Sequence, residues 1–193
     1  CSSDLEPRQG QYATIEYDME DFFISCVERY CELAGVGQAS LRAVPMPFID
    51  DKLIKADEDR ARALKSEGRI IAEGALKDIS SRVLMKILYG ARMCRYDLLK
   101  PVTYLAQRIT RWSPVCDKML HRLVCYIRCA LSMRLTGFVG DGLCDVHLGV
   151  YGDADYAGDH KDSRSTSGTF SVVFGPNTYF PISGRTAKQT CVS

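Results

Sequence analysis

Three aspartates within seven positions are the residues of this sequence best suited to chemistry. Asp153, Asp155 and Asp159 lie in "YGDADYAGDHKDSRSTSG", residues 151–168, directly after an alternating apolar run. Like charges at this spacing repel one another, and an unpaired carboxylate near a core is costly. The segment is therefore either a solvated turn or a place for a cation, and the spacing alone favours the turn.

The cation that such carboxylates would suit is Mg²⁺, which prefers hard oxygen ligands in an octahedron and keeps several waters. Phosphodiester hydrolysis uses two such ions, one to activate water and one to stabilise the departing oxygen. Asp153 and Asp155 share one side of a strand, if the strand that begins at Val146 continues that far. Several carboxylates must converge on two ions, so one strand cannot supply the whole site.

A second set of candidate ligands has helical spacing. His121, Cys125 and Cys129 recur every four residues, and Cys116 comes shortly before them. Zinc normally takes four ligands from more than one element, so a helical zinc-binding regulator is only an alternative. The nine cysteines are an odd number and lack the spacing of a disulfide scaffold. We therefore expect reduced thiols in an intracellular protein.

The net charge of +1 conceals a strongly basic middle. Residues 1–75 carry 9 Lys and Arg against 15 Asp and Glu, residues 76–135 carry 12 against 3, and residues 136–193 carry 4 against 6. The basic middle could bind a polyanion such as nucleic acid, or it could be the solvated face of ordinary helices.

Bulk composition predicts a globular chain, because 46% of the residues are hydrophobic and 25% are charged. Apolar runs fall short of the roughly 20 residues of a membrane span, and we recognise no signal peptide. We therefore expect a location in the cytoplasm or nucleus without membrane contact. Because the first residue is Cys1 rather than Met, we also expect the chain to be an excerpt of a longer polypeptide.

Apolar spacing of three and four predicts helices, and strict alternation predicts strands. The expected helices cover residues 19–34, 56–66, 79–91, 98–109 and 113–131. The expected strands cover residues 14–17, 146–151, 170–174 and 179–182, the last three forming an antiparallel meander. Residues 36–50, with two prolines, should be an extended crossing. Gly35 should end the first helix, which Asp18 should begin, and Ser113 should cap the last one.

The outer side of the last expected helix combines positive charge and thiols. At 100° per residue, the residues on its flank and back are Lys118, His121, Arg122, Cys125, Arg128 and Cys129. We therefore expect the two cysteines of this set to be partly exposed.

The quoted aspartate segment belongs to a longer pattern that resembles a known family. "YGDADYAGDHKDSRSTSGTFSVVFG" followed by "PISGRTAKQTCVS" resembles the opening of the ribonuclease H domain of copia-type LTR retrotransposon polyproteins. There a D-A-D-W-A-G-D stretch leads into K-S-T-S-G, a strand, and an I-S-W-x-S-K-K-Q-like segment. Here Tyr156 stands for the Trp, Arg164 for the Lys, and residues 184–189 for the last motif. "LMKILYGARMCRYDLLKPVTYLAQRITRWSPVCDKMLHRLVCYIRCAL" is similar to the family's stretch between polymerase and nuclease, and residues 11–50 resemble the sequence just past the polymerase catalytic strand.

The resemblance implies roles for individual residues. Asp153 matches the first metal-binding aspartate, on the first strand of the ribonuclease H fold, whereas the roles of Asp155 and Asp159 stay open. The second essential carboxylate, a Glu, and a later Asp would follow Ser193. The substrate would be an RNA–DNA hybrid, held largely through its phosphates. Candidate contacts are Lys118, Arg122, Arg128 and Lys188.

The expected fold is α+β, in which an N-terminal α/β connection region and a helical segment precede the first antiparallel strands of an incomplete ribonuclease H-like sheet. The expected parts are the end of the reverse transcriptase region (1–75), a basic helical connection (76–136) and a truncated ribonuclease H-like domain (137–193). The implied partners are the rest of the Pol polyprotein, the hybrid and, in the complete domain, Mg²⁺. The isolated chain should have no ribonuclease H or polymerase activity. The alternative is a non-catalytic relic, or a scaffold that only contacts nucleic acid.

Overall fold

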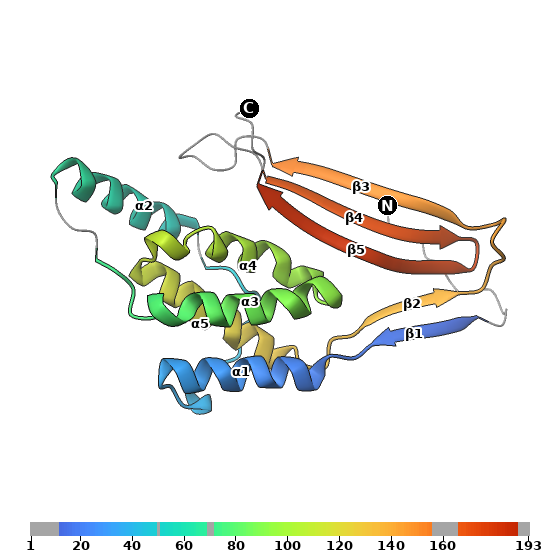
Figure 1. Ribbon diagram of the computed structural model, residues 1–193, viewed down its shortest axis with the longest axis horizontal. Helices are drawn as coiled ribbons and strands as arrows, with labels where there is room; N and C mark the ends of the chain where they lie inside the picture. Colours follow the sequence, from blue (N-terminus) through green and yellow to red (C-terminus); the bar gives the residue numbers. More distant parts are fainter. Residues whose placement is uncertain (1–11, 50, 69–71, 156–165, 189–193) are drawn as a thin grey trace. The chain divides into compact units, whose positions relative to one another are not determined.

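The computed structural model describes residues 12–49, 51–68, 72–155 and 166–188 of the chain. Within them it is an α+β protein with five α-helices and a five-stranded antiparallel sheet (Figure 1). Two compact units divide the chain. The helical unit contains residues 19–91 and 97–133, and the sheet unit contains residues 1–18, 92–96 and 134–193.

The helices follow the apolar periodicity of the sequence. Their bounds are α1 Glu20–Ala34, α2 Asp51–Ser66, α3 Lys77–Met93, α4 Leu99–Ala106 and α5 Pro114–Cys129. Short 3₁₀ turns cover Gln38–Ser40, Tyr96–Leu98 and Ile109–Arg111. All five predicted helices are thus confirmed, although α2 begins at Asp51, five residues earlier than the expected helix of residues 56–66. Each helix in the described part is too short or too polar to cross a membrane.

The ends of α1 and α5 show which helix boundaries the local sequence predicted correctly. Gly35 has φ 64° and its N–H donates to the carbonyl of Cys31, so it ends α1 as predicted. Ser113 caps α5, because its hydroxyl accepts from the N–H of Cys116 at 3.4 Å. The predicted start of α1 is wrong by one residue: the cap is Met19, and Asp18 instead forms an ion pair with Arg134 at 3.0 Å.

The core of the helical unit lies among α1, α3, α4 and α5. Its fully buried side chains include Phe23, Tyr30, Leu84, Ile87, Val102, Leu105, Leu120 and Ile127. Gly90 allows α1 and α3 to approach closely, because a Cβ there would lie 2.7 Å from Phe23 and 2.8 Å from Phe22. A larger residue at this position requires the two aromatic rings to move.

Asp117 joins the segment before α3 to the start of α5. Its carboxylate accepts from the backbone N–H of Ala75 at 2.7 Å, from that of Leu76 at 3.0 Å, and from Trp112 Nε1 at 2.6 Å. Gly74 donates its N–H to the Trp112 carbonyl and has no room for a Cβ, which would lie 2.5 Å from the carbonyl oxygen of Ser113. One carboxylate therefore holds three donors from two segments.

The sheet has the strand order β1-β2-β5-β4-β3, and every neighbouring pair is antiparallel. The strands are β1 Ala13–Tyr17, β2 Leu135–Val139, β3 His147–Asp155, β4 Thr166–Gly175 and β5 Thr178–Lys188. The predicted meander of β3, β4 and β5 is confirmed (Figure 1). In addition, β1 and β2 extend the same sheet through the pairing of Phe138 with Tyr179.

The sequence did not predict β2, because Gly137 at its centre has the appearance of a boundary. In the structure the glycine has a packing role: a Cβ there would lie 2.5 Å from the ring of Phe180. The missing side chain therefore leaves space for an aromatic ring of β5.

Candidate functional site

The motifs that carry the family resemblance meet at one end of the sheet. Asp153 on β3 is opposite Gly168 on β4, and Gly168 is opposite Thr186 on β5. The D-A-D, T-S-G and T-A-K stretches are therefore cross-strand neighbours, although 30 or more residues separate the first from the last. The next two sets of cross-strand partners are Ala154–Ser167–Ala187 and Asp155–Thr166–Lys188.

Asp153 lies two residues before the end of β3, and its side chain is exposed. The strand continues to Asp155, as required by the prediction that Asp153 and Asp155 share one side of it. Gly168 brings no side chain towards Asp153, and the space where its Cβ would be holds no atom within 4 Å. The Asp155 side chain and the whole of Asp159 lie outside the described residues. Of the three aspartates, Asp153 is thus the one whose side chain belongs to the described part of the chain.

These surroundings do not fit a complete Mg²⁺ centre. Within the described ranges, no group of three or more His, Cys, Asp or Glu side chains is placed to hold a metal ion. Asp153 supplies one exposed carboxylate, which can attract a hydrated cation but cannot fix two ions around a phosphate. The same finding means that His121, Cys125 and Cys129 form no such group with neighbouring described residues.

Asp141, which the sequence did not single out, is a carboxylate of the sheet unit that accepts two hydrogen bonds from one residue. It accepts from the backbone N–H of Asn177 at 2.7 Å and from Asn177 Nδ2 at 2.9 Å, and its own N–H donates to Thr178 Oγ1. Burial raises the pKa of Asp141, but the hydrogen bonds from Asn177 and Thr178 outweigh this and lower it. Asp141 therefore stays charged and ties the loop after β2 to the β4–β5 turn.

Two of the predicted nucleic-acid contacts are engaged inside the helical unit. Arg122 Nε donates to the carbonyl of Met46 at 3.1 Å. Arg128 donates to the carbonyls of Gln38 at 2.8 Å and Leu41 at 2.5 Å. Both arginines thus hold the segment 36–49 against α5, a role that the sequence did not indicate.

The exposure predicted for Cys125 is wrong, whereas Cys129 is exposed as expected. Cys125 is buried because segment 36–49 covers that side of α5, where Leu41 is also buried. Burial raises the pKa of the Cys125 thiol, although a hydrogen bond from the Arg42 backbone opposes the shift. This thiol is therefore protonated and shielded rather than reactive.

His121 has a structural contact as well. Its Nδ1 lies 2.9 Å from the hydroxyl oxygen of Tyr30, which joins α5 to α1. Tyr30 is almost fully buried, and burial raises the pKa of its hydroxyl above the ordinary value. Lys118, on the same helix, is exposed, and Lys188 ends β5 with its side chain outside the described part.

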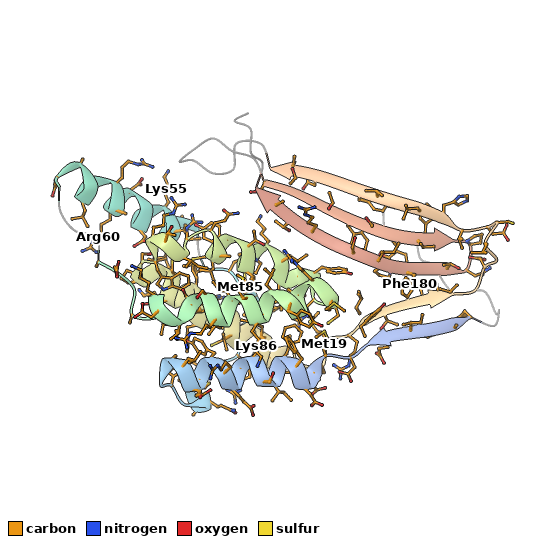
Figure 2. The ribbon with its side chains drawn as sticks, in the orientation of Figure 1. Met19, Lys55, Arg60, Met85, Lys86 and Phe180 are labelled. Atoms are coloured by element: carbon orange, nitrogen blue, oxygen red, sulfur yellow. The ribbon has the colours of Figure 1, made fainter. Side chains whose placement is uncertain are left out.

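More than half of the basic residues in 76–135 are buried or make polar contacts within the chain. Figure 2 shows Lys86 between α3 and α1, where it donates to the carbonyl of Ser25 at 3.0 Å. Seven of the twelve basic residues are buried, hydrogen-bonded or ion-paired within the chain, Lys77 through a surface pair with Glu73: Lys77, Lys86, Arg95, Arg108, Arg122, Arg128 and Arg134. The other five are exposed: Arg82, Arg92, Lys100, Arg111 and Lys118. The basic middle is therefore only partly a surface feature.

No protein-family model, no curated protein and no solved structure matches this chain.

Proposed function

We propose that the chain is part of the Pol polyprotein of a copia-type LTR retrotransposon. In this proposal it contains the region after the reverse transcriptase catalytic core and the N-terminal part of a ribonuclease H domain. The observation that carries the proposal is the pairing of Asp153 with Gly168 and of Gly168 with Thr186. The D-A-D, T-S-G and T-A-K stretches of the family-like pattern form adjacent positions of one sheet. Side chains that must act together need such proximity.

The proposed chemistry is hydrolysis of the RNA strand of an RNA–DNA hybrid. Asp153 would be one carboxylate ligand of Mg²⁺, which in such sites activates water and stabilises the leaving oxygen. An exposed carboxylate beside a glycine leaves room for a bulky phosphate backbone. The remaining carboxylates would come from downstream sequence, so the 193-residue chain is proposed to be inactive by itself.

The residues proposed to contact the hybrid differ from those that the sequence suggested. The arginines that hold segment 36–49 are already committed to carbonyl oxygens, so their charge is less available to phosphates. Exposed basic residues of the helical unit are better placed: Arg82, Lys100, Arg111 and Lys118. Binding through such residues releases counterions and must weaken steeply with salt.

A non-catalytic relic or scaffold is the second candidate, and the single described carboxylate at the motif favours it for the chain in isolation. The reading frame after the codon for Ser193 separates the two candidates. The nuclease proposal expects an open frame that encodes a Glu and then an Asp in helix-forming and loop contexts. A stop codon, or an open frame without acidic residues, would leave only the relic.

A binding experiment tests the proposed hybrid contacts separately from cleavage. Fluorescence anisotropy with a labelled RNA–DNA hybrid should show binding by the intact chain that weakens at least tenfold between 50 and 200 mM salt, on the order expected for a few phosphate contacts. Replacing Lys118 and Arg111 by Ser should weaken binding, whereas the same change at two exposed acidic residues should not. Binding that is indifferent to salt would contradict the electrostatic basis of the proposal.

A further inference from the structure

The hairpin-like ribbon of β1 and β2 is joined to the rest of the sheet along a sparsely bonded seam. Among the described residues, β1 pairs with β2 over five positions and β4 with β5 over ten, whereas β2 pairs with β5 at one position, Phe138 with Tyr179. From this pair towards the start of β2 the two strands diverge (Figure 1). The sheet therefore consists of two well-paired parts, the β1–β2 ribbon and the β3–β4–β5 meander.

The sequence of β5 explains why its pairing with β2 stops. Continued in the same register, the pairing would place Pro181 opposite Thr136, and proline has no N–H to donate to a neighbouring strand. Ile182 is an extra residue of β5, at the register shift between Ser171 and Val172 of β4. Such a bulge bends its strand and increases the local twist. β5 therefore keeps its pairing with β4 but turns away from β2.

Side chains replace the backbone ladder at the other end of the seam. The N–H groups of Gly140 and Asp141 both donate to Thr178 Oγ1 at 3.1 Å. In return, Asn177 donates its N–H and its Nδ2 to the Asp141 carboxylate, at 2.7 and 2.9 Å. We call these four residues the clasp. Because Gly140 directly follows β2, the ribbon can leave β5 at this end only if the clasp breaks.

The ribbon buries little that would oppose its separation from β5. Among the described residues, no apolar side chain of β1 or β2 is buried, and the buried position of β2 is Gly137. The ring of Phe180, labelled in Figure 2, covers that glycine, and the rings of Phe138 and Tyr179 are 6.3 Å apart. Regions with few buried apolar contacts and few backbone hydrogen bonds open at a lower free energy than the core.

We propose that the β1–β2 ribbon is a hinged arm. It opens from β5 at the Phe138–Tyr179 pair and the clasp, and it pivots on residues 140–146, which connect β2 to β3. The ion pair of Asp18 with Arg134 at 3.0 Å closes the far end of the ribbon and helps to keep its strands together. The meander can then change its orientation to the ribbon without the loss of either set of strand pairs. This inference goes beyond the proposed nuclease role, because a movement within the sheet does not depend on cleavage.

Amide hydrogen exchange of the 193-residue chain, followed residue by residue by NMR, tests the hinge. Opening exposes the N–H groups of Gly140, Asp141 and Asn177 together, although they belong to two segments of the chain. After correction for intrinsic rates, these three clasp amides should share one protection factor. It should be at least about tenfold lower than the protection factors of hydrogen-bonded amides within the β1–β2 and β4–β5 pairs.

Phe180→Ala weakens the seam without removing a hydrogen-bonding group of the clasp. It should lower the shared protection factor of the clasp amides by at least about tenfold relative to the β4–β5 amides. The matched control is Phe170→Ala on β4, because the chemical change is identical and the Phe170 ring contacts those of Tyr96 and Tyr151. This control should leave the ratio of the two protection factors unchanged.

A reversible cross-link tests the hinge even if the Phe180 variant does not fold. Phe138→Cys combined with Tyr179→Cys should form a disulfide, since directly opposed antiparallel residues are within disulfide range. Oxidation should raise the protection factor of the clasp amides towards that of the β4–β5 amides, and reduction should reverse the change. The background for this variant has four other cysteines replaced by Ser: Cys1, Cys129, Cys144 and Cys191.

Three results would overturn the proposal. Clasp amides as well protected as the β4–β5 amides show that the seam does not open before the sheet unfolds. Different protection factors for Gly140 and Asn177, or no response to the cross-link, show independent fraying of two loops. Exchange of the β1–β2 amides at the rate of the clasp amides shows that the ribbon unfolds instead of moving as an arm.

Discussion

Asp153 and Gly168 are direct cross-strand partners, and the glycine leaves the space beside the carboxylate empty. This relationship joins the two most specific parts of the family-like pattern in a single row of the sheet. Gly168 has free space around it, whereas other glycines, such as Gly90, lie where a side chain would clash.

Gly168→Ala and Gly90→Ala should therefore have opposite effects on stability. An added methyl at Gly168 meets no atom within 4 Å, so the free energy of unfolding should stay level or rise by up to about 1 kcal/mol. At Gly90 the helix propensity of Ala is favourable, but the methyl clashes with Phe22 and Phe23, and we expect a loss of about 1–3 kcal/mol. Urea unfolding followed by circular dichroism measures both values. Stabilisation by Gly90→Ala would contradict the close contact of α1 and α3 at this glycine.

Arg128→Ala should release segment 36–49 from α5. Loss of the hydrogen bonds to Gln38 and Leu41 should cost about 1–3 kcal/mol, because each involves a charged donor. The buried Cys125 thiol should then react with a thiol reagent in the native protein. Lys118→Ala is the control, since this residue is exposed on the same helix and should change neither quantity. Unaltered thiol protection in the Arg128 variant would contradict the proposed covering role.

Asp117→Ala should be among the most destabilising single changes in the helical unit. It leaves two backbone N–H groups and the Trp112 indole N–H without their acceptor, which should cost about 2–4 kcal/mol. Trp112 is the single tryptophan of the sequence, so its fluorescence reports directly on this junction. Asp78→Ala, at an exposed position in the first turn of α3, should cost less than about 1 kcal/mol. Equal losses in the two variants would show that the Asp117 hydrogen bonds add nothing specific.

Alkaline pH should destabilise the helical unit through its buried thiols. Burial raises the pKa of Cys26 from 9.0 to about 11, with a smaller opposing effect of Lys86. The unfolded state therefore loses this proton first, and the free energy of unfolding should fall as pH rises between these two values, by at most about 1.4 kcal/mol per pH unit from this group. Cys26→Ala should flatten that decrease in a pH series of urea titrations. An unchanged slope would assign the alkaline loss to other groups.

The sequence predicted most elements because their signals are local. Gly35 and Ser113 mark helix ends through their own backbone and side chain, and the alternation in β3 identifies a strand without knowledge of its neighbours. The failures involve contacts between distant segments. The covering of Cys125 depends on Met46 and Leu41, some 80 residues earlier in the chain, and no periodicity in α5 reports it.

The residues of the candidate site likewise divide into those that local sequence predicted and those that depend on distant contacts. Asp153 was found because its motif is continuous in the sequence, and its strand reached the expected length. Asp117 and Asp141 were not predicted, since an isolated aspartate acquires a role only when a folded backbone presents its N–H groups. Surface charge was overestimated for a related reason: arginine can serve phosphates or carbonyl oxygens, and only the fold decides which.

Cleavage of an RNA–DNA hybrid by the chain extended through its downstream carboxylates is the measurement that tests the central claim most directly. With Mg²⁺ present, the extended protein should cut the RNA strand, Asp153→Asn should reduce the rate by at least a hundredfold, and Asp145→Asn, an exposed aspartate before β3, should leave it unchanged. The 193-residue chain should show no cleavage. An extended protein that binds the hybrid without cutting it, or one that cuts equally well after Asp153→Asn, would contradict the assignment of Asp153 to a nuclease centre.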